Sequence, residues 1–149
     1  MHRILLLHGI NHNMFGKRSS AQYGAITLDE INLQALDIAE ELGVELEFFQ
    51  SNFEGEMCER IHRAYEDQVD AVVINAGAWT HYSYGIHDAL EILEVPIIEI
   101  HMSNIYQREE FRRKSVFEDL VQGQIIGFGM DSYLLGLRAM VSTVRNTLF

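Results

Sequence analysis

The sequence predicts a single α/β domain, a doubly wound parallel sheet of five strands in a three-layer αβα arrangement. Two observations predict it. Short apolar runs alternate five times with segments of helical periodicity, and the first run is continuous, as in a strand buried on both faces. The 149 residues suit one domain, and a hydrophobic content of 48% supplies a core. We therefore expect residues 1–149 to form one unit, without a linker or a repeat.

Five segments have the apolar character of buried strands. Pro96 stands directly before the fourth of them. Five β–α units of this kind favour a parallel sheet with helices on both faces, and a flavodoxin-like arrangement is the natural form for five strands. The expected strands are Arg3–Leu7, Val44–Phe49, Ala71–Ile74, Ile97–Ile100 and Gln124–Phe128.

Helical segments follow the strands, and the first is the best defined. Thr27 and Glu30 form a capping box, and Gly43 is typical of a helix C-terminus. A short charged turn, Arg108–Lys114, stands between the fourth and fifth strands. The expected inward-facing residues are Leu28, Ile31, Ala35, Ile38, Ala39 and Leu42 on the first helix, Met57, Ile61, Ala64 and Tyr65 on the second, Ile86, Ala89, Leu90 and Leu93 on the third, and Leu134, Leu137, Val141 and Val144 on the last.

Charge and composition exclude several classes of protein. The 11 basic and 22 acidic residues give a net charge of −11, which argues against a nucleic-acid partner. The lone Cys58 excludes an intrachain disulfide and a cysteine-built metal site. No stretch approaches the ~20 apolar residues of a membrane span, and the apolar run Ile4–Leu7 is too short for a secretory signal. We expect no membrane association and a cytoplasmic location.

Polar side chains follow four of the predicted strands. In an open parallel sheet the ligand binds beyond the carboxyl ends of the strands, so these groups predict a polar site for a small hydroxylated molecule. Helix capping is the alternative explanation for about half of the Asn and Ser residues. The residues are His8 and Asn11; Gln50, Ser51 and Asn52; Asn75, Thr80 and His81; and His101, Ser103 and Asn104.

The segment Gly9–Ile26 is too long for an ordinary connection. Strand-to-helix connections usually have ~2–6 residues, and longer ones are often lids or disordered. We expect a lid at about residues 14–25. Arg18 beside Tyr23 would favour the phenolate form of the tyrosine, which could then act as a base. A solvated loop with incidental aromatic residues is the alternative.

Other chemical motifs are weak. His8 and His12 lack a third metal ligand, and Cys58 is typical of a small core residue. The sequence has no G-x-S-x-G, Walker A or G-x-G-x-x-G motif. The basic cluster within 108–114 could hold a substrate carboxylate or form a solvated face. We expect neither a metal nor a cofactor.

Several longer motifs, which together span nearly the whole chain from about Ile4 to Leu137, match those of one known protein family. They are Gly16-Lys-Arg18 with Tyr23-Gly24, Gln50-Ser-Asn52-x-Glu54-Gly-Glu56, Asn75-Ala-Gly-Ala-Trp-Thr-His81 with Ser83 and Asp88-Ala-Leu90, and Glu99-Ile-His101-Met-Ser103-Asn104 with Arg108-Glu-Glu-Phe-Arg112. Jointly these motifs are highly specific, and the chain resembles the type II 3-dehydroquinate dehydratases.

The resemblance implies a hydro-lyase that removes water from 3-dehydroquinate by anti elimination through an enolate, giving 3-dehydroshikimate without a cofactor. By position, Tyr23 would remove the C2 proton, and Arg18 would hold it as phenolate. Asn11 would position a water that stabilises the enolate. His101 would protonate the departing C1 hydroxyl, with Glu99 as its partner. The step is common to the shikimate pathway and to quinate breakdown.

The resemblance also implies a binding set and an assembly. Asn75, His81 and Arg112 would bind the hydroxyls and the carboxylate, together with Met102 and Ser103. The family assembles as trimers packed into a homododecamer, in which Asp88 would reach a neighbouring subunit's site. Arg108 would help to tie down the lid.

Some positions depart from the family pattern. The family's Asn-Gly-Pro-Asn-Leu-Asn opening is His8-Gly9-Ile10-Asn11-His12-Asn13 here, Ser20 replaces a proline in the lid, Phe117-Glu-Asp-Leu120 replaces a stretch with Ser-Pro, and His87 stands where arginine is common. These changes keep three alternative functions open for the chain. It could be a divergent paralogue that acts on another cyclic hydroxy-ketone acid, a non-catalytic protein that binds a cyclitol acid or, from the fold alone, a flavin-binding flavodoxin.

Overall fold

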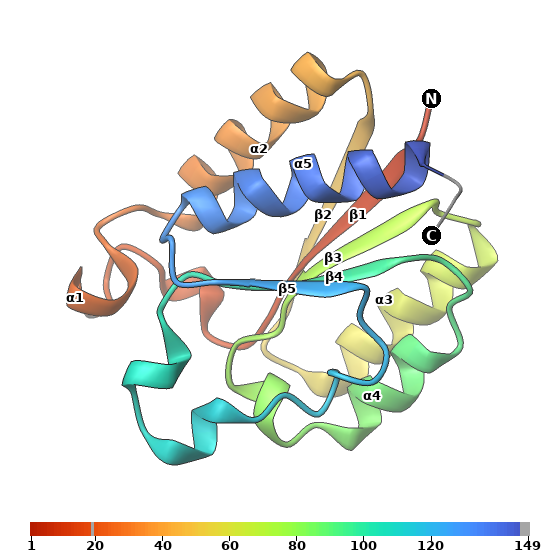
Figure 1. Ribbon diagram of the computed structural model, residues 1–149. Coiled ribbons are helices and arrows are strands. Elements are labelled where there is room, and N and C mark those ends of the chain that lie inside the picture. The colour runs from red at the N-terminus through yellow and green to blue at the C-terminus, as the bar shows by residue number, and fades with distance from the viewer. Residues whose placement is uncertain (19, 147–149) are drawn as a thin grey trace.

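The centre of the protein is one parallel sheet (Figure 1). The computed structural model describes residues 1–18 and 20–146. Within them the strand order is β2-β1-β3-β4-β5, and each neighbouring pair is parallel. This is the flavodoxin-like doubly wound order, so the predicted fold class is confirmed. The strands are β1 (Arg3–His8), β2 (Glu45–Gln50), β3 (Ala71–Asn75), β4 (Ile97–His101) and β5 (Gly123–Ile126).

Two pairs of helices cover the sheet. α2 (Leu28–Leu42) and α5 (Asp131–Arg145) lie on one face, while α3 (Glu54–Glu66) and α4 (Tyr84–Glu91) lie on the other (Figure 1). Successive side chains of a strand point to opposite faces, so β1 contributes to both resulting cores. Its even-numbered apolar residues pack with α2 and α5, and its odd-numbered ones pack with α3 and α4. This two-sided burial explains why the strand is apolar throughout.

The predicted ends of α2 are confirmed by the capping geometry. The backbone N–H of Glu30 donates to Thr27 Oγ1 at 3.2 Å. At the other end Gly43 adopts a left-handed conformation with φ 71°, which glycine reaches at little cost. Local sequence therefore fixes both ends of this helix. None of the helices in residues 1–18 and 20–146 is long and apolar enough to cross a membrane.

Two connections contain short helical turns. In the described chain, β4 and β5 are joined by two 3₁₀ turns, η3 (Ile105–Gln107) and η4 (Glu110–Arg113), and η4 lies within the charged turn predicted at Arg108–Lys114. The long segment after β1 contains η1 (His12–Met14) and the short helix α1 (Ser20–Tyr23). Single turns of this length are too short to show a hydrophobic period, so periodicity does not predict η1, α1 or η3. A further turn, η2 (Gly77–His81), follows β3.

Two predicted positions are wrong in detail, and the stripe predicted for the last helix is incomplete. Tyr65 is 53% exposed at the end of α3, because the apolar face there narrows to Met57, Ile61 and Ala64. Phe128 is 63% exposed and lies past β5, which ends at Ile126. On α5 the buried residues also include Ser132, Tyr133, Gly136 and Met140, which the predicted stripe omitted.

Candidate active site

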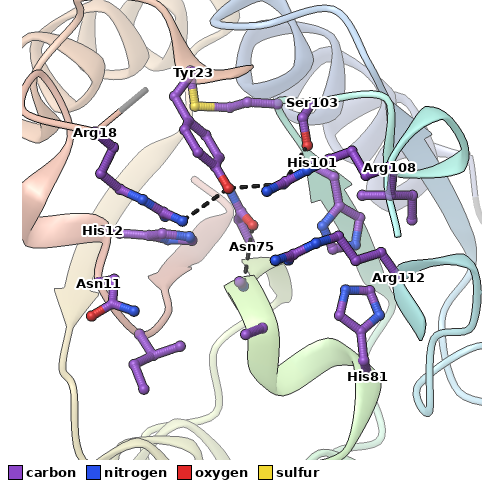
Figure 2. A pocket seen from close by; sticks show the side chains of 15 residues that line it. Asn11, His12, Arg18, Tyr23, Asn75, His81, His101, Ser103, Arg108 and Arg112 are labelled. Carbon is purple, nitrogen blue, oxygen red and sulfur yellow. Dashed lines mark hydrogen bonds between the residues drawn. The ribbon is translucent and has the colours of Figure 1, made fainter. Parts of the chain in front are cut away.

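A pocket lies at the carboxyl ends of β1, β3 and β4 (Figure 2). The short helix α1 and the β4–β5 connection lie at the same edge of the sheet (Figure 1). The pocket wall carries three guanidinium groups, three imidazoles, two amides and a phenol. No carboxylate is among the lining residues that the structure describes. The pocket is thus a local positive region in an acidic protein. The lining residues are Ile10, Asn11, His12, Arg18, Tyr23, Asn75, Gly77, Ala78, His81, His101, Met102, Ser103, Ile105, Arg108 and Arg112.

The hydroxyl of Tyr23 lies between two arginines (Figure 2). It accepts hydrogen bonds from Arg18 Nη2 at 2.9 Å and from Arg108 Nη1 at 2.8 Å. The guanidinium carbon of Arg18 also lies 4.0 Å from the centroid of the tyrosine ring. Two positively charged donors therefore meet on one phenol oxygen. Arg108 Nη1 also donates to Ser103 Oγ at 3.2 Å, which fixes it to the end of β4.

A buried acid–imidazole pair stands on β4. Glu99 and His101 point to the same side because they are two residues apart in a strand. His101 Nε2 lies 2.6 Å from Glu99 Oε2, and Ser115 Oγ donates to Glu99 Oε1 at 2.6 Å. Glu99 is 0% exposed and His101 is 5% exposed. With Nε2 engaged by the carboxylate, the Nδ1 atom of His101 is the one free to act in the pocket.

Asn75 is fixed by two buried contacts. Its Nδ2 group donates to the Tyr133 hydroxyl at 2.8 Å, and its Oδ1 accepts from the Gly77 N–H at 3.3 Å. Burial raises the pKa of Tyr133, so that side chain remains a neutral phenol. The second N–H of the Asn75 amide is therefore left for a ligand.

His81 presents an acceptor. Its Nδ1 atom lies 2.8 Å from the Lys114 carbonyl, to which it donates. Burial lowers the pKa of His81, so Nε2 carries a lone pair that suits a ligand hydroxyl. The ring stacks against His101 with the centroids 6.3 Å apart.

The side-chain amides of Gln50 and Asn52, at the end of β2, hold the segment that follows β1 and do not line the pocket. Asn11 has a left-handed backbone with φ 68°, and its N–H donates to Asn52 Oδ1 at 2.8 Å. Gln50 Nε2 donates to the Gly9 carbonyl at 3.1 Å. Gly9 itself needs its missing side chain, because a Cβ there would lie 2.1 Å from the Ala76 carbonyl oxygen. Contacts from the end of β2 therefore hold Asn11 at the pocket.

The strand-end prediction is consequently correct for three strands and wrong for β2. Thr80 and Asn104 are also absent from the lining, and Asn104 instead caps η3. His8 lies under the site with Nε2 donating to Asn32 Oδ1 at 2.8 Å, and burial lowers its pKa to about 4.

Of the residues implied by the resemblance, most meet in this pocket. Met102, Ser103 and Arg112 line it, and Arg112 Nε pairs with Glu109. Glu99 lies directly behind His101. Asp88 lies on α4 outside the pocket and pairs with His87 at 3.0 Å, so its predicted place in a neighbouring subunit's site stays a prediction.

Sequence reasoning missed three residues of the site. Ser115 and Tyr133 hold Glu99 and Asn75 through contacts 16 and 58 residues apart, for which the sequence carries no local signal. His12 was considered as a metal ligand and as a departure from the family pattern, but not as a pocket residue. Its ring lines the pocket, and its place directly after Asn11 was the available signal.

Comparison with known proteins identifies the family. The class II dehydroquinase family model matches residues 2–141. A protein of Syntrophotalea carbinolica named 3-dehydroquinate dehydratase is 62% identical over 145 residues, covering 97% of this chain and 98% of its own. One of Leptothrix cholodnii with the same name is 63% identical over 142 residues, covering 95% of each. The crystal structure of the type II dehydroquinase of Butyrivibrio crossotus superposes with a TM-score of 0.90 at 38% identity, over 93% of this chain and 97% of that one. The chain therefore belongs to the class II dehydroquinase family.

Proposed function

We propose that this chain is a 3-dehydroquinate dehydratase, a hydro-lyase that converts 3-dehydroquinate to 3-dehydroshikimate through an enolate and needs no cofactor. One observation carries the proposal. The pocket combines a tyrosine hydroxyl held by two guanidinium groups with a histidine backed by a buried carboxylate. Loss of water from a β-hydroxy ketone needs a base at one carbon and an acid at the next, and these two groups supply them.

Tyr23 acts in the first step. As phenolate it takes the proton from C2 of the substrate, and the electron pair of that bond moves onto the C3 ketone oxygen. Arg18 and Arg108, at 2.9 and 2.8 Å from the tyrosine oxygen, hold it as an anion before the step. Asn11 positions a water against the enolate oxygen. A positioned base contributes ~10²–10⁴ in rate, and one preorganised enolate contact contributes about 10²–10³.

His101 acts in the second step. The enolate re-forms the ketone, the C1–oxygen bond breaks, and His101 protonates the hydroxyl as it leaves as water. Glu99, at 2.6 Å, orients the imidazole, while Ser115 keeps the carboxylate in place. The proton gained by Tyr23 then returns to His101 through solvent, which restores both groups.

The remaining polar groups bind the substrate. Arg112 pairs with the carboxylate, since a guanidinium offers two parallel donors to that group. Asn75 and His81 hold the ring hydroxyls with one donor and one acceptor. The Ser103 hydroxyl and the backbone at Met102 complete the contacts.

Absorbance measurements test the proposal. Purified protein mixed with 3-dehydroquinate should produce the absorbance of the conjugated enone. Tyr23→Phe should lower kcat by about 10³-fold while leaving the fold intact. Tyr82→Phe removes the same atom from an exposed residue and serves as the control. No turnover by a folded wild type would refute the proposal, and binding without turnover would indicate the cyclitol-acid binding protein instead. Faster turnover of another cyclic hydroxy-ketone acid would indicate the paralogue.

The assembly and the location complete the proposal. A homododecamer built from trimers would have twelve times the chain mass of 17.1 kDa, which light scattering measures. Asp88→Ala would then lower activity only in the assembled enzyme, because Asp88 lies outside its own chain's pocket. A monomer of full activity would contradict this assembly. We place the protein in the cytoplasm, consistent with its single cysteine.

A further inference from the structure

His12 stands at the pocket wall in the position after Asn11. It begins the 3₁₀ turn η1, and its ring stacks on Phe15 with centroids 4.5 Å apart and an interplanar angle of 18°. The residue is 2% exposed, yet its ring edge lines the pocket. Figure 2 shows the ring beside Arg18, pointing toward the space between Tyr23 and Asn75. An imidazole thus faces the place where the substrate would bind.

The contacts of the ring define its tautomer. The Gly9 N–H is shared between two acceptors, the Asn75 carbonyl at 2.7 Å and His12 Nδ1 at 3.0 Å. A nitrogen that accepts from a backbone N–H has no proton of its own, so the ring proton is on Nε2. Burial lowers the pKa of His12 well below its usual value, and the neighbouring positive charge of Arg18 acts in the same direction. The ring is therefore a neutral donor.

The donor on Nε2 is not used within the described chain. Within residues 1–18 and 20–146 the structure shows a hydrogen bond to His12 Nδ1 and none to Nε2. Gly77 keeps the space beside it open, because a Cβ at that residue would lie 3.0 Å from Nε2. Glycine is also the residue that best tolerates the φ of +63° found there. An oriented N–H group thus faces the pocket with no partner.

We infer that His12 Nε2–H donates a hydrogen bond to the substrate oxygen that becomes negative when Tyr23 removes the C2 proton. This inference rests on the proposed dehydratase function and adds a catalytic residue to it. A fixed neutral donor stabilises a developing enolate without an acidic proton that would quench the Tyr23 phenolate. It also adds no second positive charge beside Arg18. His12 and the water positioned by Asn11 then act on the same oxygen.

Kinetics of His12→Leu and His12→Gln test the role. Leucine fills a similar volume against Phe15 but removes the donor, so kcat should fall about 100-fold with KM changed less than about threefold. Glutamine returns an N–H donor and should restore part of kcat. Enolate formation would become slower in His12→Leu, so the kinetic isotope effect with C2-deuterated substrate should increase. A packing role alone would leave that isotope effect unchanged.

His62→Leu is the matched control, since His62 is exposed on α3 and should keep wild-type kcat. Melting temperatures of all variants establish that they are folded. An active wild type together with a His12→Leu variant of unchanged kcat would overturn this inference and leave the dehydratase proposal standing. A kcat loss with an unchanged isotope effect would overturn it as well. An inactive wild type would refute the proposed function itself.

Discussion

Tyr133→Phe removes one buried oxygen and tests how Asn75 is held. The Tyr133 hydroxyl accepts from Asn75 Nδ2 at 2.8 Å, and both side chains are buried. Phenylalanine keeps the ring that packs between α5 and the sheet, so the change creates almost no cavity. Its effect should therefore come from the amide group that loses its acceptor.

The size of the effect follows from that lost acceptor. Leaving a buried donor unsatisfied costs about 1–3 kcal/mol of the free energy of unfolding. For a domain of this length each kcal/mol corresponds to a change of roughly 2–4 °C in melting temperature, so we expect Tm to fall by roughly 2–12 °C. Because the Asn75 amide is then held only through its Oδ1 contact with Gly77, KM for 3-dehydroquinate should rise more than kcat falls.

Thermal unfolding at one fixed protein concentration and steady-state kinetics measure both effects. Tyr65→Phe, which removes the same atom from a residue 53% exposed on α3, is the control and should change stability by less than about 0.5 kcal/mol. Equal Tm values for Tyr133→Phe and the wild type would refute the reasoning, since they would mean that Asn75 needs no partner on α5. A lower Tm with an unchanged KM would refute only the link to binding.

Three further predictions concern the Glu99 carboxylate, the buried imidazole of His8 and the contact between α5 and the sheet at Gly136. Ser115→Ala removes the donor to Glu99, so kcat should fall up to about 100-fold as His101 loses its alignment; Ser142→Ala on the exposed side of α5 is the control, and equal kcat values would contradict the expectation. Burial lowers the pKa of His8 to about 4, so the imidazole binds a proton more tightly in the unfolded chain than in the folded one. The free energy of unfolding should therefore decrease by up to about 3 kcal/mol as the pH falls from about 6.5 to 4. The urea midpoint should depend less on pH in His8→Gln than in the wild type, and an equal pH dependence would exclude His8 as the cause. Gly136→Ala places a Cβ at 2.8 Å from Ile100 Cγ2, so either the Ile100 side chain or α5 must shift, and the free energy of unfolding should fall by about 1–3 kcal/mol although alanine is the better helix former. Gly55→Ala, with open space around it on α3, should instead be neutral or stabilising in the same urea titration. Equal midpoints for the two variants would contradict the clash.

Much of the fold could be predicted because the signals are local. The continuous apolar run of β1 indicates burial on two faces, and Thr27 and Gly43 mark the ends of α2 by capping chemistry. The β4–β5 connection was predicted as a charged turn at Arg108–Lys114, where η4 lies, whereas η3 was not predicted because it buries only Ile105 and so leaves no period. Periodicity predicts elements that pack against the sheet and misses those that do not.

The candidate site also contains some residues that the sequence predicts and others that it does not. The strand-end rule finds Asn75 and His101 without any relative, because parallel strands deliver their carboxyl ends to one edge. The contact between Arg108 and Tyr23, by contrast, joins residues 85 positions apart. Which distant groups meet depends on the packed chain, and only the family resemblance suggested that Arg108 belongs near the lid. Short sequence motifs do not show which distant residues are in contact in the folded chain.

The positive pocket in an acidic chain gives the protein a filter based on ligand size. A small monoanion that reaches the mouth of the pocket is within a Debye length of Arg18, Arg108 and Arg112, about 8 Å at physiological ionic strength, and feels their attraction. A polyanion that extends well beyond that distance also meets the remaining surface, which belongs to a chain of net charge −11. We therefore expect nucleic acids and long polyphosphates to bind this site more weakly than a small molecule with a single carboxylate does.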